Sequence, residues 1–195
     1  MYAKWMTFVL TTVLVATGSL FAQQKQSSMA GQTMQNSADR SFIDAAAEAN
    51  LGEIDIAKMV VQKSTELAVK DFANRMVTDH TQASQKLASV AEMNGVTLPT
   101  EASATERNQK SELEKLSGAQ LNDAYLRDEL QGHKETISAF ESEIEHGQNQ
   151  EAKNYAEQTL PTLQDHIRIA ENVAGKLGLP GKAGLSDEAK AITAK

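Results

Sequence analysis

The sequence contains no cysteine, only three prolines and few aromatic residues, which make up 5% of its 195 positions. The absence of cysteine excludes a disulfide framework, a lipid-modified cysteine and thiolate chemistry at a metal or redox site. The abundance of alanine, glutamate, glutamine, lysine and leucine is typical of a helical protein. Because disulfides are excluded, the packing of helices must provide the stability.

A cluster of basic residues is also missing from the sequence. The 19 basic and 26 acidic residues give a formal net charge of -7, and removal of Lys4 with a signal peptide would leave 18 basic residues and a charge of -8. Such a surface repels nucleic acid and anionic lipid. We therefore expect no nucleic acid partner and no tight membrane insertion of the mature chain.

The N-terminus has the pattern of a secretory signal peptide. Lys4 precedes an apolar run from Trp5 to Phe21, and Ala22 is a small residue at the expected cleavage point. We predict a signal over residues 1–22 and a periplasmic or secreted protein of the cell envelope. Leu20, three positions before the cut, leaves open the alternative that the run of about 17 residues is retained as an anchor.

The rest of the chain fits one domain with a polar segment at each end. Residues 23–40 are polar and have no period, so we predict a flexible tether, and residues 179–195 are predicted to form a C-terminal tail. The periodic part, residues 41–178, predicts four long helices, the first capped by Ser41. These helices are expected over residues 41–62, from a cap at Ser64 or Thr65 to Asn94, over 119–146 and over 151–177.

A long connection separates the second and third of these helices. It runs from Gly95 to Gly118 and contains a capping box, because Ser103 and Glu106 have the spacing to cap a short helix that carries Leu113. Two helical hairpins joined by one long crossover have the order of a ferritin-like bundle. The predicted fold is therefore all-α, a ferritin-like four-helix bundle with a short extra helix.

Each long helix has an apolar stripe that includes one polar residue. At about 100° per residue, Glu53 lies within the first stripe and His80 on the flank of the second. His133 and His166 lie within the third and fourth stripes, whereas His146 projects to the outside. Counting about 1.5 Å per residue from the hairpin turns places His133 and His166 at the same depth in the bundle. The same count leaves Glu53 and His80 at depths that differ by about 5 Å. We expect the four inward groups to meet in one layer.

Two interpretations of this layer stay open. In the first, Glu53 accepts hydrogen bonds from the histidines, and the satisfied polar layer fixes the register of the helices. In the second, a single ion of zinc, iron, manganese or copper is held by Glu53, His80, His133 and His166.

Three further residues lie near this layer. Asp79 and Glu129 are close to the histidine stripes and could orient an imidazole, although solvated helix surface is the more common place for such residues. Pro161 lies inside the fourth helix and predicts a kink about one turn before His166.

Four strings resemble one bacterial family. The strings "SFIDAAAEANLGEIDIAKMV", "FANRMVTDHTQASQKL", "GHKETISAFE" and "LPTLQDHIRIAE" are similar to the domain-of-unknown-function family numbered 4142, sometimes labelled predicted outer membrane proteins. The resemblance covers Ser41 to Leu177. It implies a ferritin-like bundle and an exported location, and it implies no established activity.

The sequence departs from the di-iron pattern of ferritin-like proteins. That pattern places Glu-x-x-His on two helices and single glutamates on the others. Here Val77 and Leu163 stand three positions before His80 and His166, and His133 replaces a glutamate. We therefore do not expect a di-iron centre, ferroxidase chemistry or iron storage.

The sequence predicts no reaction, because it shows neither a nucleophile with a base at a recognisable spacing nor a glycine-rich phosphate loop. The first predicted function is an exported helical module that contacts other envelope proteins, in which the polar layer sets the register. The alternative is a mononuclear metal-binding protein, redox or metal-sequestering, that uses the four residues of the layer.

Overall fold

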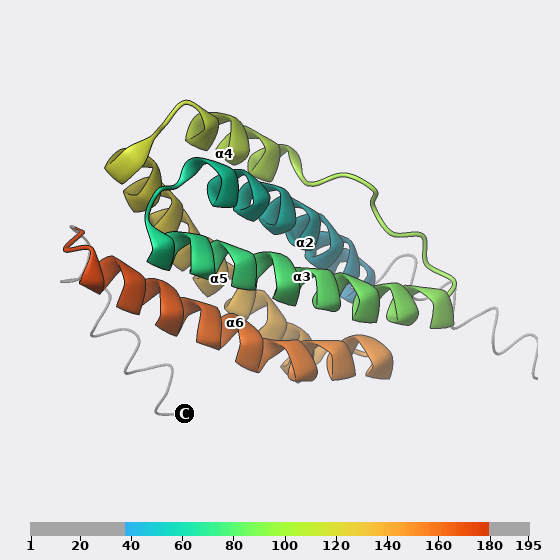
Figure 1. Cartoon of the computed structure of the whole chain (residues 1–195). Coiled ribbons are helices and arrows are strands. Elements are labelled where there is room, and N and C mark those ends of the chain that lie inside the picture. The colour runs from blue at the N-terminus through green and yellow to red at the C-terminus, as the bar shows by residue number, and fades with distance from the viewer. Residues whose placement is uncertain (1–37, 180–195) are drawn as a thin grey trace, which may run out of the picture.

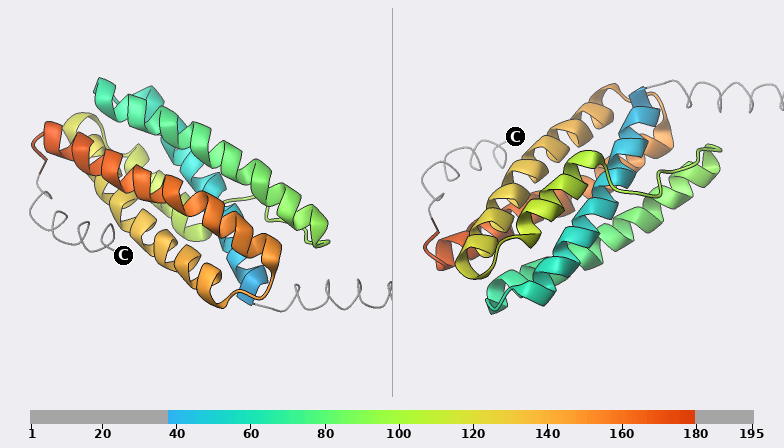
Figure 2. Two further views of the ribbon diagram at one scale, coloured as in Figure 1. Left: turned by 90° about the horizontal axis from the view of Figure 1, so that it is seen from below. Right: turned by 90° about the horizontal axis from the view of Figure 1, so that it is seen from above.

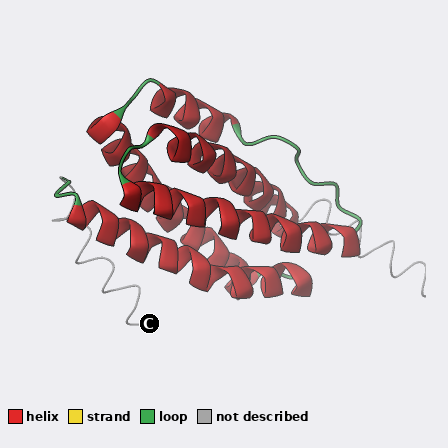
Figure 3. Cartoon of the chain, viewed as in Figure 1, coloured by secondary structure: helices red, strands yellow, loops and turns green. Residues whose placement is uncertain are grey.

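The computed structural model describes residues 38–179, which form five helices and no strand (Figure 1, Figure 3). The four long helices are α2 (Ala38–Lys63), α3 (Leu67–Met93), α5 (Gly118–His146) and α6 (Gln150–Lys176), and the short one is α4 (Ala104–Glu114). The predicted signal, residues 23–37 of the predicted tether and residues 180–195 of the predicted tail lie outside the described residues. None of the described helices combines the length and the apolar character needed to cross a bilayer.

Two antiparallel hairpins make up the bundle, α2 with α3 and α5 with α6 (Figure 1). The hairpins pack on each other mainly through α3 and α6, and to a smaller extent through α2 and α5. After α3 the chain returns along α2 through α4, so that α5 begins at the end of the bundle where α3 also begins (Figure 2). The predicted order, with a long crossover and a short extra helix, is confirmed.

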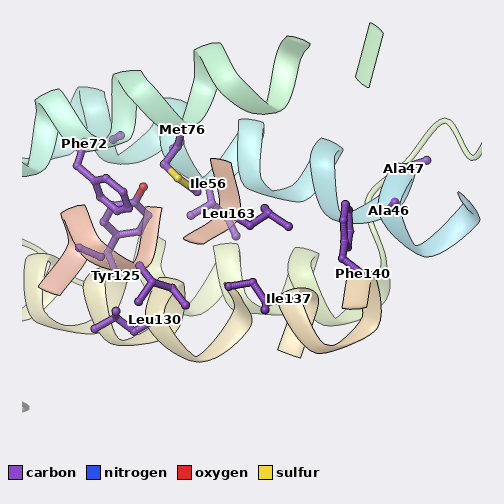
Figure 4. Packing of buried hydrophobic residues seen from close by; sticks show 14 of the residues in the cluster. Ala46, Ala47, Ile56, Phe72, Met76, Tyr125, Leu130, Ile137, Phe140 and Leu163 are labelled. Atoms are coloured by element: carbon purple, nitrogen blue, oxygen red, sulfur yellow. The ribbon is translucent and has the colours of Figure 1, made fainter. Parts of the chain in front are cut away.

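Apolar side chains from all four long helices fill the space between them (Figure 4). Ile56 of α2, Met76 of α3, Leu130 of α5 and Leu163 of α6 are each at most 3% exposed. Burial of one such side chain contributes about 1.5–3 kcal/mol, so this core holds the helices together without disulfides. The polar residues between these side chains are therefore surrounded by closely packed apolar groups.

The start of α2 differs from the prediction. The helix begins at Ala38, and Ser41 lies inside it and is not its cap. Asp39 is buried, and its carboxylate accepts a hydrogen bond of 2.8 Å from the backbone amide of Gln148. This contact ties the first turn of α2 to the loop between α5 and α6.

The capping predictions for α3 and α4 have opposite outcomes. The N-cap of α3 is Glu66, without a side-chain capping bond, so the predicted cap one or two residues earlier is wrong. The reason is that the Ser64 hydroxyl accepts from the Glu66 amide at 3.1 Å and donates to Asn122 of α5 at 2.8 Å. The predicted capping box of α4 is confirmed, because Ser103 and Glu106 bond reciprocally.

Two glycines inside helices have different surroundings. A Cβ atom at Gly52 of α2 would lie 2.7 Å from the side chain of Glu106, whereas nothing lies within 4 Å of a Cβ atom at Gly132 of α5. The missing side chain at Gly52 therefore lets α4 approach α2 closely.

We predict opposite effects of alanine at these two positions. Gly52→Ala should lower the free energy of unfolding by on the order of 1 kcal/mol, because overpacking against Glu106 outweighs the gain in helix propensity. Gly132→Ala should raise it by about 0.5–1 kcal/mol, because only the propensity changes. Urea denaturation followed by circular dichroism measures both, and equal stabilisation by the two substitutions would contradict the close packing of α4.

Candidate metal centre

Three buried histidines meet in the middle of the bundle. His80 comes from α3, His133 from α5 and His166 from α6, and their exposed fractions are 5%, 2% and 1%. One ring nitrogen of each lies within 4.8 Å of the corresponding atoms of the other two. The ring centroids are 5.1 to 5.7 Å apart. The shortest approach is 3.1 Å, between Nε2 of His133 and Nδ1 of His166.

The other nitrogen of each ring is hydrogen-bonded to a fixed acceptor. The three bonds are all 2.9 Å long and run from His80 Nδ1 to Asn50 Oδ1, from His133 Nδ1 to the Glu129 carbonyl oxygen and from His166 Nε2 to Asp79 Oδ2. A neutral imidazole has one N–H group, and here that group points outward. The remaining nitrogen of each ring therefore carries a lone pair, and it faces the other two rings.

Burial keeps the three rings neutral. It lowers the pKa of His133 to about 3, with a further contribution from His166. It also lowers the pKa of His80 far below 6.5 and, against the field of Asp79, the pKa of His166. At pH 7 two lone pairs thus face each other across 3.1 Å without a proton between them. A tetrahedral zinc ion at about 2.0–2.1 Å from each nitrogen would set such ligands about 3.3 Å apart, so the spacing suits a cation.

Asp79 holds the ring of His166 in this orientation. Burial alone would raise the pKa of Asp79, but its hydrogen bonds with Arg75 and His166 outweigh that effect and lower it. The Arg75 Nε atom lies 2.5 Å from the carboxylate, and the guanidinium also reaches Asp165 at 3.7 Å. An ionised carboxylate behind an imidazole is a typical arrangement around metal-ligating histidines.

Sequence reasoning missed Asn50, which holds His80. Asn50 is 5% exposed, and its amide group also donates to the Tyr155 hydroxyl at 3.3 Å. In this orientation of the amide, Oδ1 faces His80 and the NH₂ group faces Tyr155. The available signal was its position three residues before Glu53, which places it on the same face of α2.

Glu53 does not join the three histidines but lies in a neighbouring group with Glu129 and His133, in which the ligand atoms are again within 4.8 Å of one another. Glu129 is 2% exposed, and its Oε2 atom lies 3.4 Å from Nδ1 of His133. The surface position considered more common for Glu129 is therefore wrong. Because Glu129 lies four residues before His133 on α5, both side chains face the interior.

Glu53, which is half-buried, and the buried Glu129 form an acid pair. Burial raises the pKa of Glu53 to about 7, and it raises the pKa of Glu129 well above 4.5, with the charge of Glu53 as the next cause. Within residues 38–179, no N–H or O–H group donates to either carboxylate oxygen of Glu129. A carboxyl proton shared between Glu53 and Glu129 can supply a hydrogen bond to these oxygens.

A small cleft between α3 and α6 reaches His80 and His166. Its volume is about 40 Å³, and Thr159 and Leu163 belong to its lining. That space is enough for a water molecule or a small ligand. Pro161 lies beside this lining, and α6 is continuous through it from Gln150 to Lys176.

Together, the fold and the site define an all-helical bundle protein with a buried histidine cluster at its centre. The chain belongs to the DUF4142 family, a domain of unknown function whose family model matches residues 24–173. This match confirms the family resemblance found in the four sequence strings. No curated protein matches the chain.

A similar fold is found in a solved structure. It is the crystal structure of a DUF305 protein from Streptomyces coelicolor, whose description as secreted is an inference. The two chains are 14% identical with a TM-score of 0.62, and the match covers 73% of this chain and 95% of the other. At this identity the similarity concerns the helical fold alone.

The acid pair predicts a pH-dependent effect of Glu53→Gln in metal-free protein. The folded-state pKa of Glu53 is raised to about 7 from 4.5, so its contribution to stability is present below pH 4.5 and is lost as the pH rises through 7. Glutamine does not titrate. The stability of the variant relative to the natural protein should therefore increase by on the order of 1–3 kcal/mol between pH 4.5 and pH 8. Urea denaturation in chelator-containing buffer measures this difference, and a difference independent of pH would contradict the assignment.

Proposed function

We propose that this protein is an exported metal-binding protein that holds one transition-metal ion through His80 Nε2, His133 Nε2 and His166 Nδ1. The observation that carries the proposal is the direction of the three lone pairs, since each ring uses its N–H group on an outer acceptor. A layer that served only helix register would satisfy its members with one another. Here, among the described residues, Nε2 of His80 has no hydrogen-bond partner.

The ligand chemistry favours zinc or copper over manganese. Neutral imidazole nitrogens suit borderline ions such as zinc and copper, whereas manganese prefers oxygen ligands. Three protein ligands leave a further coordination position, as in many sites that bind an exchangeable water or small ligand. The cleft of about 40 Å³ beside His80 and His166 supports access to that position. In this proposal Glu53 is not a ligand of the ion.

The proposed location is the cell envelope or the outside of the cell. It is supported by the signal pattern of residues 1–22 and by the secreted description of the structural neighbour. Sequestration of a metal ion by an exported protein fits a site that is closed on most sides by apolar packing. The outer-membrane label of the family and contacts with other envelope proteins stay predictions.

Metal titration tests the proposal with two histidine variants. Protein purified without an affinity tag and treated with a chelator should bind one Co²⁺ ion per chain with a visible tetrahedral-type absorption, and Zn²⁺ should displace it. His133→Ala should abolish this absorption, because it removes one of the three ligands. His146→Ala is the matched control, since that side chain is 70% exposed and lies outside the cluster, and it should bind like the natural protein.

Two outcomes would refute the metal site. The first is that the protein binds none of Co²⁺, Zn²⁺ and Cu²⁺ and that its melting temperature does not change when these ions are added. The second is equal loss of binding in His133→Ala and His146→Ala, which would locate the ion on the surface.

The role of Asp79 gives a second test. Asp79→Asn should weaken Zn²⁺ binding by about 10- to 100-fold, because the carboxylate behind His166 orients the ring and increases its basicity. Asp165→Asn is the control, because Asp165 also contacts Arg75, at 3.7 Å, and acts on His166 through its charge without a hydrogen bond to the ring. Competition with a chromophoric chelator measures both affinities. If the two variants bind equally well, Asp79 has no part in the site.

A further inference from the structure

We infer that Glu53 and Glu129, flanked by His133 and Tyr125, form a second cation position beside the three-histidine centre, and that it takes a hard divalent cation such as Mn²⁺. This inference rests on the carboxylates of Glu53 and Glu129, which are not ligands in the proposed function, and the two sites share only His133.

The carboxylates of the acid pair come from two helices that otherwise touch little. Glu53 projects from α2 and Glu129 from α5, and a ligand atom from each lies within 4.8 Å of a ring nitrogen of His133. Glu129 is 2% exposed. Oε2 of Glu53 and both carboxylate oxygens of Glu129 are buried and accept no hydrogen bond from residues 38–179. Three carboxylate oxygens without donors thus lie at the contact between α2 and α5.

The surrounding charges do not balance the pair. The charged groups that raise the pKa of both acids include Asp128, and Glu106 of α4 acts on Glu53 in addition. Burial of two carboxylates side by side is costly unless a proton or a cation lies with them. A divalent cation satisfies both acids at once, whereas a shared proton satisfies them only in part.

Tyr125 lies one turn before Glu129 on the same face of α5. Tyr125 is fully buried, and its hydroxyl group has no hydrogen-bond partner in the described part of the chain. Burial raises the pKa of Tyr125, and the charges of Glu129 and Glu53 raise it further. Its ring packs against Phe72, with the centroids 5.9 Å apart.

The ligand set identifies the kind of cation. Two carboxylates with one imidazole nearby form an oxygen-rich site, which suits Mn²⁺ or Fe²⁺ better than copper. His133 separates this position from the three-histidine centre, because its Nε2 atom faces His166 and its Nδ1 atom lies 3.4 Å from Glu129 Oε2. The spacing also explains why the di-iron pattern is not seen in the sequence, since Glu129 precedes His133 by four positions and not three.

Manganese binding tests the inference on the full chain, purified without an affinity tag and freed of metal. Free Mn²⁺ is measured at pH 8 from its electron paramagnetic resonance signal, with circular dichroism to show that each variant is folded. The natural protein should bind one Mn²⁺ ion per chain. Glu53→Gln should weaken this binding by at least about tenfold, since even residues behind a ligand contribute that much. Glu145→Gln, at a side chain that is 76% exposed, is the matched control and should leave it unchanged.

The variant His80→Ala separates this site from the three-histidine centre. It should retain Mn²⁺ binding within about twofold while losing Co²⁺ absorption. Retention of Mn²⁺ binding without Co²⁺ binding in the natural protein would support the second position and refute the proposed function. The inference is overturned if no Mn²⁺ binds with a dissociation constant below about 1 mM. It is also overturned if Glu53→Gln and Glu145→Gln bind equally, or if His80→Ala alone removes the binding.

Discussion

A neutral imidazole has a single N–H group, and the acceptor that receives it decides where the lone pair points. The centre of this bundle depends on that constraint. The acceptor for His80 is Asn50 on α2, and the acceptor for His166 is Asp79 on α3. His133 instead donates to the carbonyl group of Glu129, one turn earlier on its own helix α5. The packing of α2 on α3 and of α3 on α6 therefore sets the directions of two of the three lone pairs.

The apolar core gives these polar contacts their effect. Met76, Leu130 and Leu163 are buried and lie three or four positions from the histidines in sequence, so the rings have mostly apolar surroundings. Burial also lowers the pKa of the rings, so the lone pairs stay free at neutral pH. The same burial acts in the opposite direction on Glu53 and Glu129 and keeps protons on acids that lack a counter-ion. The same apolar surroundings thus favour the neutral form of both the histidines and the adjacent acids.

Helical periodicity was enough to predict that His80, His133 and His166 face the interior of the bundle. His133 and His166 lie in one hairpin, so a count from the turn placed them at one level, and their rings are in contact at 3.1 Å. The count across the other hairpin left Glu53 and His80 about three residues apart in depth, and the structure groups Glu53 with α5 side chains.

Partners between helices left no local signal. Helical spacing places Asn50 and Glu129 on the inner faces of α2 and α5, but it does not identify the side chains that they meet on other helices. The start of α2 was predicted wrongly for the same reason, because the contact that holds Asp39 is with Gln148, which is 109 positions further along the chain.

Nitrogen NMR of the histidine side chains tests the central claim most directly. In metal-free protein labelled with ¹⁵N at histidine, long-range proton–nitrogen spectra at pH 7 report which nitrogen of each ring carries the proton. The orientation of the three rings predicts neutral imidazoles that are protonated at Nδ1 in His80 and His133 and at Nε2 in His166. Addition of one equivalent of Zn²⁺ should then shift only the opposite nitrogen of each ring. A ring protonated on the inward nitrogen, or an imidazolium at pH 7, would contradict it.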